Sequence, residues 1–275
     1  MAAVSDNLIH FLARASKDSP GKQFAVFKSI IETGLRASRM QIKFGDGGSV
    51  FNDVVCFTDI PLAQCDEHTA VYGKFGIGFK KSFVKVRGGN PARYFVDYVP
   101  GTTGAAGALE SRGLLSLQLN QLQKLVLDLS NRLAVPSFAM FDESQQQIAT
   151  HEQLEGYRLA LLYLLSFEKE MGDLGSARDD TDDIDLYYKE REWRLVPAKA
   201  GVDAKLTVME HSESGPKYRF PFDANALNMV VVPNDETRAE VLRYLLSFAN
   251  STDPRLKGFA ESPVPIITYD DLKRW

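Results

Sequence analysis

The sequence predicts an α+β protein in which two β-rich segments flank a helical insertion. Short β-branched and aromatic runs occupy both ends of the 275-residue chain, and leucines at helical spacing fill its middle. Strands and helices that are segregated along a chain are typical of α+β folds. We therefore expect a single α+β domain over residues 1–275, with a helical insertion at about 105–171.

The composition is that of an ordinary soluble globular protein. Apolar residues make up 44% of the chain, charged residues 25%, and the formal net charge is −4. This balance excludes a global basic field for nucleic acid or membrane, although it leaves a local basic patch open. The two cysteines, Cys56 and Cys65, have no CxxC spacing, which fits a reducing compartment. With no signal peptide and no apolar run near about 18 residues, we expect a cytoplasmic protein without membrane contact.

The most informative stretch covers residues 54–79. Residues 54–57 predict a strand, and Ile60 and Pro61 end it, because proline lacks an N–H and restricts the residue before it. The run FGIGF (75–79) predicts a second strand with its large side chains on one face and two glycines on the other. A glycine-bearing face lets a backbone or ligand approach closely. The stretch therefore indicates either the floor of a pocket or a β-bulge packed against a helix.

The residues around this stretch predict further elements. Residues 7–14 alternate as a strand, and residues 24–35 have the spacing of a short helix with Gly34 as its C-cap. The glycine-rich residues 44–49 predict a loop, and another strand begins near Ala92.

The middle of the chain predicts two helices. Leucine and valine at helical spacing run through residues 105–134, and Thr150 and Gln153 form a capping-box pattern before the second apolar stripe. We expect the two helices to pack as an antiparallel pair beside the sheet. Their stripes favour a packed core over a groove for a partner.

The C-terminal part returns to strands. The acidic residues 177–185 predict a solvated loop, because Ile184 stands where a calcium loop needs glycine. The elements expected after it are a strand at 187–196, a hairpin at 204–222, a strand at 228–233, a helix at 236–249 capped by Asn234 or Asp235, and a strand at 264–269.

Two carboxylates dominate the strand at 187–196. Alternation places Glu190 and Glu192 on one face and Trp193 on the other. Because like charges repel, the pair needs a cationic partner, a bound ligand or full solvent. The strand is therefore either part of a site or an edge strand with hydrated charges.

The histidines are the other candidates. His10 shares a predicted strand face with Arg14, either as a hydrogen-bonded core residue or as a ligand-binding one. His68 and Tyr72 are one helical turn apart, so a short helix would present them together. The sequence has no Walker A loop, GxGxxG, HExxH or GxSxG motif, so we predict neither a metal site nor a serine-hydrolase mechanism.

Several runs together resemble one family. They are VCFTDIPL (55–62) followed by His68, YGKFGIGFKK (72–81), GGNPARYF (88–95) and YYKEREWRLVP (187–197). With these runs the chain resembles the AbiGi family of bacterial abortive-infection proteins, over roughly residues 5–100 and 185–235. The resemblance implies a role in phage resistance, as the antitoxin of an abortive-infection pair with a partner toxin.

The order of elements is similar to a second, more distant group, the ADP-ribosyltransferase fold that includes the DNA-modifying toxin DarT. That resemblance implies a mixed or antiparallel sheet core, NAD as a substrate, and transfer of ADP-ribose to a nucleic acid or protein. By position it assigns NAD binding to His10, Arg14, Thr58 and Tyr72, and catalysis to Glu192 and Glu190 together with His10.

Two functional hypotheses follow. The leading one is NAD-dependent ADP-ribosyl transfer by a defence protein, in which a fixed carboxylate stabilises the cationic transition state. The alternative is a non-catalytic antitoxin that keeps the sheet without the NAD chemistry. Catalysis requires His10 and Glu192 to face each other across one cleft with the strand at 75–79, whereas a binding protein does not.

Overall fold

The chain forms two compact units in the computed structural model. The structure describes residues 6–12, 19–44, 48–61, 64–96, 114–136, 138–141, 144, 147–171, 191–213 and 215–272. Unit 1 comprises Met1–Ser38, Asp53–Pro91 and Lys189–Trp275, and unit 2 comprises Arg39–Asn52 and Ala92–Tyr188. The expectation of one domain over the whole chain stays a prediction.

Unit 1 is built on a mixed sheet. Its strand order is β15 (Ile266–Thr268), β14 (Leu227–Val232), β5 (Gly76–Lys80), β1 (Asn7–Phe11), β4 (Gly48–Thr58), β11 (Glu192–Leu195) and β6 (Asn90–Pro91). The pair β14 and β15 is parallel, and the other neighbours in this order are antiparallel. The sheet is mainly antiparallel and occurs together with helices, so the predicted α+β class is confirmed.

One face of this sheet carries the main apolar core. On this face Leu8 lies opposite Phe79, and both side chains are fully buried. The helices that add buried side chains to the same core are α1 (Pro20–Thr33), α3 (Lys81–Val86), α8 (Asp235–Leu246) and α9 (Pro254–Glu261). Each large apolar side chain buried here contributes about 1.5–3 kcal/mol.

A second, smaller sheet lies in unit 1. It contains β12 (Val208–Ser212), β13 (Gly215–Phe220) and β2 (Leu35–Arg36) in that order, so the hairpin predicted at 204–222 is confirmed. Asn234 caps α8 by accepting a hydrogen bond from the Thr237 N–H at 2.9 Å. The shorter helices of unit 1 are α2 (Asp66–Tyr72), α7 (Lys199–Asp203), η3 (Ala224–Ala226), η4 (Ser247–Asn250) and α10 (Tyr269–Leu272).

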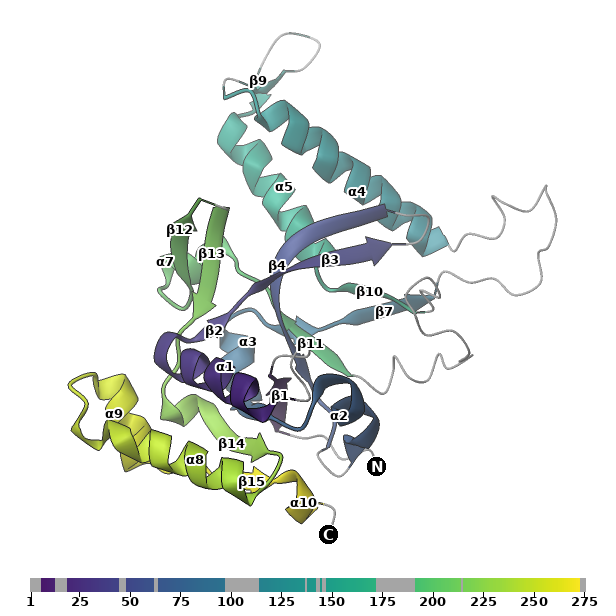
Figure 1. Cartoon of the computed structure of the whole chain (residues 1–275). Helices are drawn as coiled ribbons and strands as arrows, with labels where there is room; N and C mark the ends of the chain where they lie inside the picture. Colours follow the sequence, from purple (N-terminus) through teal and green to yellow (C-terminus); the bar gives the residue numbers. More distant parts are fainter. Residues whose placement is uncertain are drawn as a thin grey trace, which may run out of the picture. The chain divides into compact units, whose positions relative to one another are not determined.

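Unit 2 contains the predicted helical pair. The two helices, α4 (Leu114–Leu133) and α5 (His151–Leu165), lie side by side (Figure 1). They are antiparallel, because Leu119 near the start of α4 packs with Leu165, and Leu129 near its end packs with Leu154. The antiparallel pairing is confirmed, while residues 105–113 lie outside the described part of the chain.

The remaining elements of unit 2 are short strands. They are β3 (Ser38–Phe44), the parallel pair β7 (Arg93–Val96) and β10 (Glu168–Met171), and the hairpin β8 (Met140–Phe141) and β9 (Gln147–Ala149). The capping box of α5 is confirmed: Thr150 Oγ1 accepts from the Gln153 N–H at 3.2 Å, and Gln153 Oε1 accepts from the Thr150 N–H at 2.9 Å. Among the described helices, none has both the length and the apolar character needed to cross a membrane.

Gly34 ends α1 as the sequence predicts. Its φ is 92°, and its N–H donates to the Ile30 carbonyl at 2.8 Å. A Cβ at this position would lie 2.7 Å from the Phe220 carbonyl oxygen, so both the dihedral angle and the space require glycine.

We expect Gly34→Ala to lower the free energy of unfolding by at least about 1–3 kcal/mol, because alanine rarely adopts this φ and its methyl group meets backbone. Gly156→Ala is the matched control in an exposed turn of α5, where a Cβ meets nothing within 4 Å. We expect it to stabilise by about 0.5–1 kcal/mol. Urea unfolding of both variants measures the two effects. Equal stability of wild type and Gly34→Ala would contradict the structure at this cap.

Candidate functional site

Three of the predicted site residues, His10, Thr58 and Glu192, lie on the neighbouring strands β1, β4 and β11, while Tyr72 lies on α2. Thr58, the last residue of β4, lies opposite Ile9 of β1 on one side and opposite Glu192 of β11 on the other. Its side chain is buried. Thr58, which belongs to the run VCFTDIPL (55–62), therefore lies between β1 and β11 in the sheet of unit 1.

The strand register places His10 and Glu192 on opposite faces of the sheet. Residues directly opposite each other on antiparallel strands share a face, and successive residues alternate. Glu192 thus shares a face with Thr58 and Ile9, whereas His10 shares the other face with Phe57, whose ring centroid lies 5.8 Å from that of His10. The expected arrangement of His10 and Glu192 across one cleft is wrong, and the roles assigned to these residues stay predictions.

Glu192 has the cationic partner that a buried carboxylate needs. Its Oε1 accepts from Arg194 Nε at 2.8 Å, and the side chains are only 12% and 5% exposed. The two residues lie on one face of β11 because they are two positions apart. This ion pair compensates the charge of Glu192 inside the protein.

The strand that carries Glu192 is shorter than the sequence predicts. Arg191 has a φ of 40°, a left-handed conformation that ends regular alternation, and β11 begins at Glu192. Regular strand alternation therefore does not continue through Arg191, and it cannot be used to place Glu190 on the same face as Glu192. Glu190 lies outside the described residues, as does Arg14.

His10 has the contacts of a core histidine. Its Nδ1–H donates to the Cys56 carbonyl at 2.8 Å, which leaves Nε2 as the unprotonated nitrogen of the neutral ring. Burial lowers the pKa of His10, and the hydrogen bond to Cys56 opposes this effect only partly. Of the two interpretations of His10, the geometry favours the hydrogen-bonded core residue.

The short helix α2 presents His68 and Tyr72 together, as expected. Their rings stack with centroids 4.3 Å apart, and the His68 ring lies 4.9 Å from that of Phe11.

Cys65, just before α2, is fully buried, and burial together with Asp66 raises the pKa of its thiol to about 12. Such a thiol stays protonated near neutral pH and is a poor nucleophile.

The glycine face of β5 is filled by the protein itself. A Cβ at Gly76 would lie 2.9 Å from Ile9 Cγ2, and one at Gly78 would lie 2.6 Å from Met229 Cγ. The close approach that these glycines permit is therefore made by side chains of the neighbouring strands. Of the two interpretations of this stretch, these contacts favour packed neighbouring strands over an open pocket floor.

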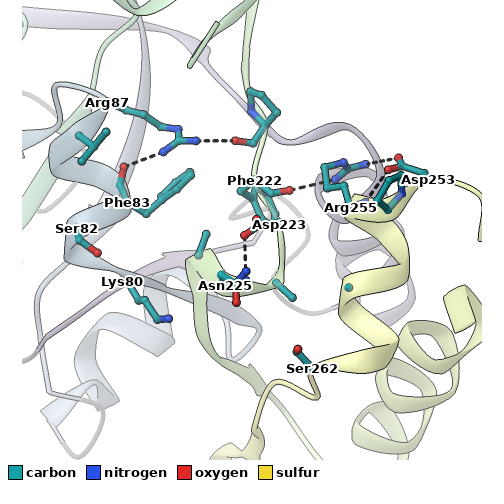
Figure 2. A pocket seen from close by; sticks show the side chains of 16 residues that line it. Lys80, Ser82, Phe83, Arg87, Phe222, Asp223, Asn225, Asp253, Arg255 and Ser262 are labelled. Atoms are coloured by element: carbon teal, nitrogen blue, oxygen red, sulfur yellow. Dashed lines mark hydrogen bonds and ion pairs between the residues drawn. The ribbon is translucent and has the colours of Figure 1, made fainter. Parts of the chain in front are cut away.

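Sequence reasoning missed one concave region of unit 1. It lies between α3, residues 221–226 and α9, and has a volume of about 800 Å³ (Figure 2). Its residues come from three distant segments without a recognised motif, so no pattern in the sequence joins them. No group of three or more potential metal ligands occurs among the described histidines, cysteines and acidic residues.

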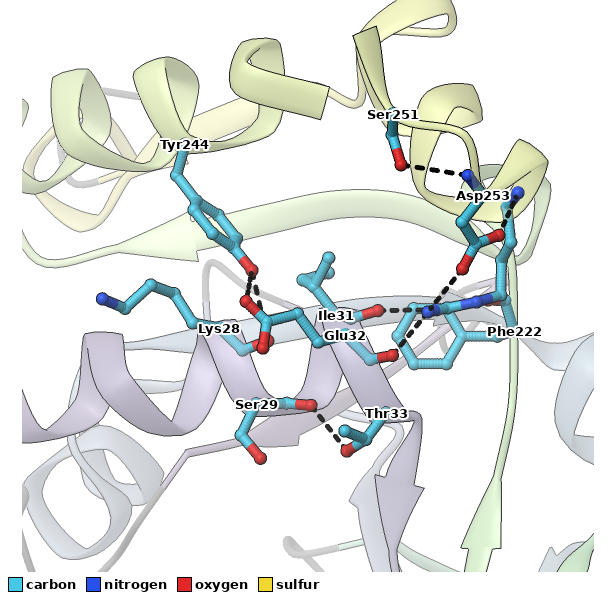
Figure 3. A network of polar contacts seen from close by, with 10 residues as sticks. Lys28, Ser29, Ile31, Glu32, Thr33, Phe222, Tyr244, Ser251 and Asp253 are labelled. Carbon is cyan, nitrogen blue, oxygen red and sulfur yellow. Dashed lines mark hydrogen bonds and ion pairs between the residues drawn. The ribbon is translucent and has the colours of Figure 1, made fainter. Parts of the chain in front are cut away.

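Arg255 fixes the helix that forms one wall of this region. Figure 3 shows the network of polar contacts around Glu32, Tyr244 and Asp253. Arg255 Nη1 donates to the Ile31 carbonyl at 2.6 Å and its Nη2 to the Glu32 carbonyl at 2.5 Å. These carbonyls belong to the last turn of α1, where helical partners are missing and positive charge is favourable. Tyr244 binds the Glu32 carboxylate at 2.8 Å, and burial and Glu32 raise the pKa of Tyr244. The network joins α1, α8 and α9.

Comparison with known protein families identifies a match over the central part of the chain. A family model described as "Putative abortive phage resistance protein AbiGi, antitoxin" matches residues 50–227, which is more than half of the chain. No curated protein and no solved structure matches the chain.

Burial of His10 predicts a pH-dependent stability. Because its pKa in the folded state is below 6.5, the unfolded chain binds the proton more readily. The contribution of neutral His10 is therefore present above about pH 6.5 and is lost as the pH falls through the lower folded-state pKa. We expect His10→Gln to remove this part of the pH dependence, at most about 1.4 kcal/mol per pH unit.

Urea unfolding at pH 7.5 and 5.5 measures this difference, with His211→Gln as the control for replacing an exposed histidine. An unchanged dependence in His10→Gln would contradict the burial of a neutral ring.

We expect Arg255→Met to lower the free energy of unfolding by about 1.5–3 kcal/mol, because it removes charged hydrogen bonds to two helix carbonyls. Lys257→Met is the control on the same helix: its ion pair with Glu261 is about half exposed and contributes less than about 0.5 kcal/mol. Denaturant unfolding compares the two. Similar losses in both variants would show that the Arg255 network adds nothing to stability.

Proposed function

The chain belongs to the AbiGi family of putative abortive phage resistance proteins, and we propose that it is the antitoxin of an abortive-infection pair that acts by binding a partner toxin. In this role it neutralises the toxin without chemistry of its own. The family description carries the defence role, and the geometry around Glu192 favours binding over catalysis.

The single observation that carries the non-catalytic part is the direction of Glu192. A carboxylate that stabilises an oxocarbenium-like transition state must point at the position where the positive charge develops. Glu192 is instead paired with Arg194, on the sheet face opposite to His10. A guanidinium at 2.8 Å already neutralises the charge that the reaction would need. NAD-dependent transfer on an ADP-ribosyltransferase-like sheet remains the alternative to be tested.

The helical pair of unit 2 supplies a surface for a protein partner. Large apolar side chains on α4 and α5 are about half exposed, among them Leu127, Tyr157 and Leu164. Exposed apolar side chains gathered on one pair of elements are typical of protein-binding surfaces, and Tyr is enriched at their centres. We place the toxin-binding surface here, within α4 and α5.

Co-expression tests this function. The toxin encoded at the same locus is expressed in bacteria with or without the chain, and growth and complex formation are measured. We expect the toxin alone to arrest growth, and the chain to restore growth and to co-elute with the toxin. Growth arrest by the chain alone, or failure to rescue any toxin of the locus, would contradict the antitoxin role.

We expect Leu164→Lys to weaken the complex by on the order of tenfold or more, because it introduces a charge into an apolar contact. Leu246→Lys is the matched control, since Leu246 on α8 is exposed to the same degree (49% against 51%) but lies in unit 1. Affinity is measured by calorimetry with purified toxin. If both variants bound the toxin with equal affinity, this would contradict the placement of the toxin-binding surface on α5.

Nicotinamide release tests the alternative. Purified wild type and Glu192→Gln are incubated with NAD and extract of phage-challenged cells, and free nicotinamide is measured. We expect no release above the protein-free blank from either protein, because Glu192 is held by Arg194. Nicotinamide release by the wild type that falls on the order of 10²–10³-fold in Glu192→Gln would instead support the hypothesis of an enzyme with Glu192 as its catalytic residue.

A further inference from the structure

The depression between α3, residues 221–226 and α9 has the character of a ligand site. Its volume of about 800 Å³ lies within the range of about 300–1,000 Å³ that is usual for small-molecule sites. None of the residues that line it belongs to the predicted NAD site. Its walls are mostly apolar and include Phe83, Val86, Pro221, Phe222 and Pro254.

Several polar side chains line this depression with their hydrogen-bonding capacity unused (Figure 2). Within the described part of the chain, the side chains of Lys80, Ser82, Asn225 and Ser262 make no hydrogen bond or ion pair. A mainly apolar cavity with a few convergent polar groups is the usual form of a small-molecule site.

Arg87 is the most unusual of the lining residues. Its guanidinium lies 3.9 Å from the Phe83 ring centroid, and its terminal nitrogens donate to the carbonyls of Phe83 at 3.3 Å and Pro221 at 3.2 Å. Its Nε is buried without a hydrogen-bond partner. Each terminal nitrogen keeps one further N–H, so the guanidinium can still donate to an oxyanion.

The acidic residues nearby are already engaged. Asp223 caps η3 by accepting from the Asn225 N–H at 3.0 Å, and Asp253 caps α9 by accepting from the Arg255 N–H at 2.8 Å. Arg255 in turn donates to the carbonyls of α1. Among the described residues that line the depression, the positive charges without a carboxylate at ion-pair distance are those of Lys80 and Arg87, and Asp223 acts on Arg87 only from beyond that distance.

We propose that this depression binds a small organic anion, a carboxylate or phosphate monoester attached to an apolar group. The oxyanion accepts hydrogen bonds from Arg87, because a planar guanidinium matches the geometry of both anions, and Lys80 adds a second positive charge at the other end of α3. The apolar group lies against the walls near Val86, which is 67% exposed in the free protein. This site is independent of the proposed toxin-binding function.

Calorimetric titration of the full chain tests the proposal with defined probes: sodium hexanoate, hexyl phosphate, neutral hexanamide and inorganic phosphate. We expect saturable binding of hexanoate or hexyl phosphate with a dissociation constant on the order of 1 mM, as ligands of this size allow. Hexanamide and inorganic phosphate each lack one half of the required chemistry and should bind at least about tenfold more weakly. The tighter of the two organic anions identifies the preferred oxyanion.

Two variants locate the site. Arg87→Met keeps the aliphatic stem without the guanidinium, and we expect about tenfold weaker binding or more, whereas Arg243→Met on exposed α8 should bind like wild type. Because Arg87 also links α3 to Pro221, Lys80→Met provides a second test on a side chain without internal partners. Binding equal to wild type in both Arg87→Met and Lys80→Met would overturn the proposal. It would also be overturned if hexanamide bound as tightly as the anions, or if neither organic anion showed saturable binding.

Discussion

The antiparallel register of β4 with its neighbours determines what the centre of unit 1 can do. Thr58 lies opposite Ile9 and opposite Glu192, so these three side chains share one face. Because the side-chain period of a strand is two, a slip of one residue would reverse every face. The core holds this register, since a slip of β4 would remove Phe57 from it. It turns His10 towards that core and Glu192 away from it.

Local features were the ones that the sequence could predict. Gly34 as a C-cap and the capping box of Thr150 and Gln153 depend only on residues within one turn. The alternation of the strand at 75–79 likewise needs no distant contact. His68 and Tyr72 stack because a helix places residues four apart on one face. These elements appear where the sequence places them.

The site depended on contacts that a sequence does not reveal. The left-handed conformation of Arg191 interrupts residues 187–196, which the sequence predicts as one continuous strand. Arg194 forms an ion pair with Glu192, the carboxylate that was assigned to catalysis. Met229 covers the glycine face from a strand more than 150 residues away along the chain. The depression near Arg87 is assembled from three segments without a motif. Which side chains meet there follows from tertiary structure alone.

The proposed binding role rests on the opposite orientation of His10 and Glu192, and one measurement tests it directly. Nuclear Overhauser contacts of the His10 ring protons in the isotope-labelled protein report which side chains lie within about 5 Å, the span of close ring contacts. We expect contacts of His10 with the Phe57 ring and none with the side-chain protons of Glu192. A contact between His10 and Glu192 would place both on one face and contradict the account.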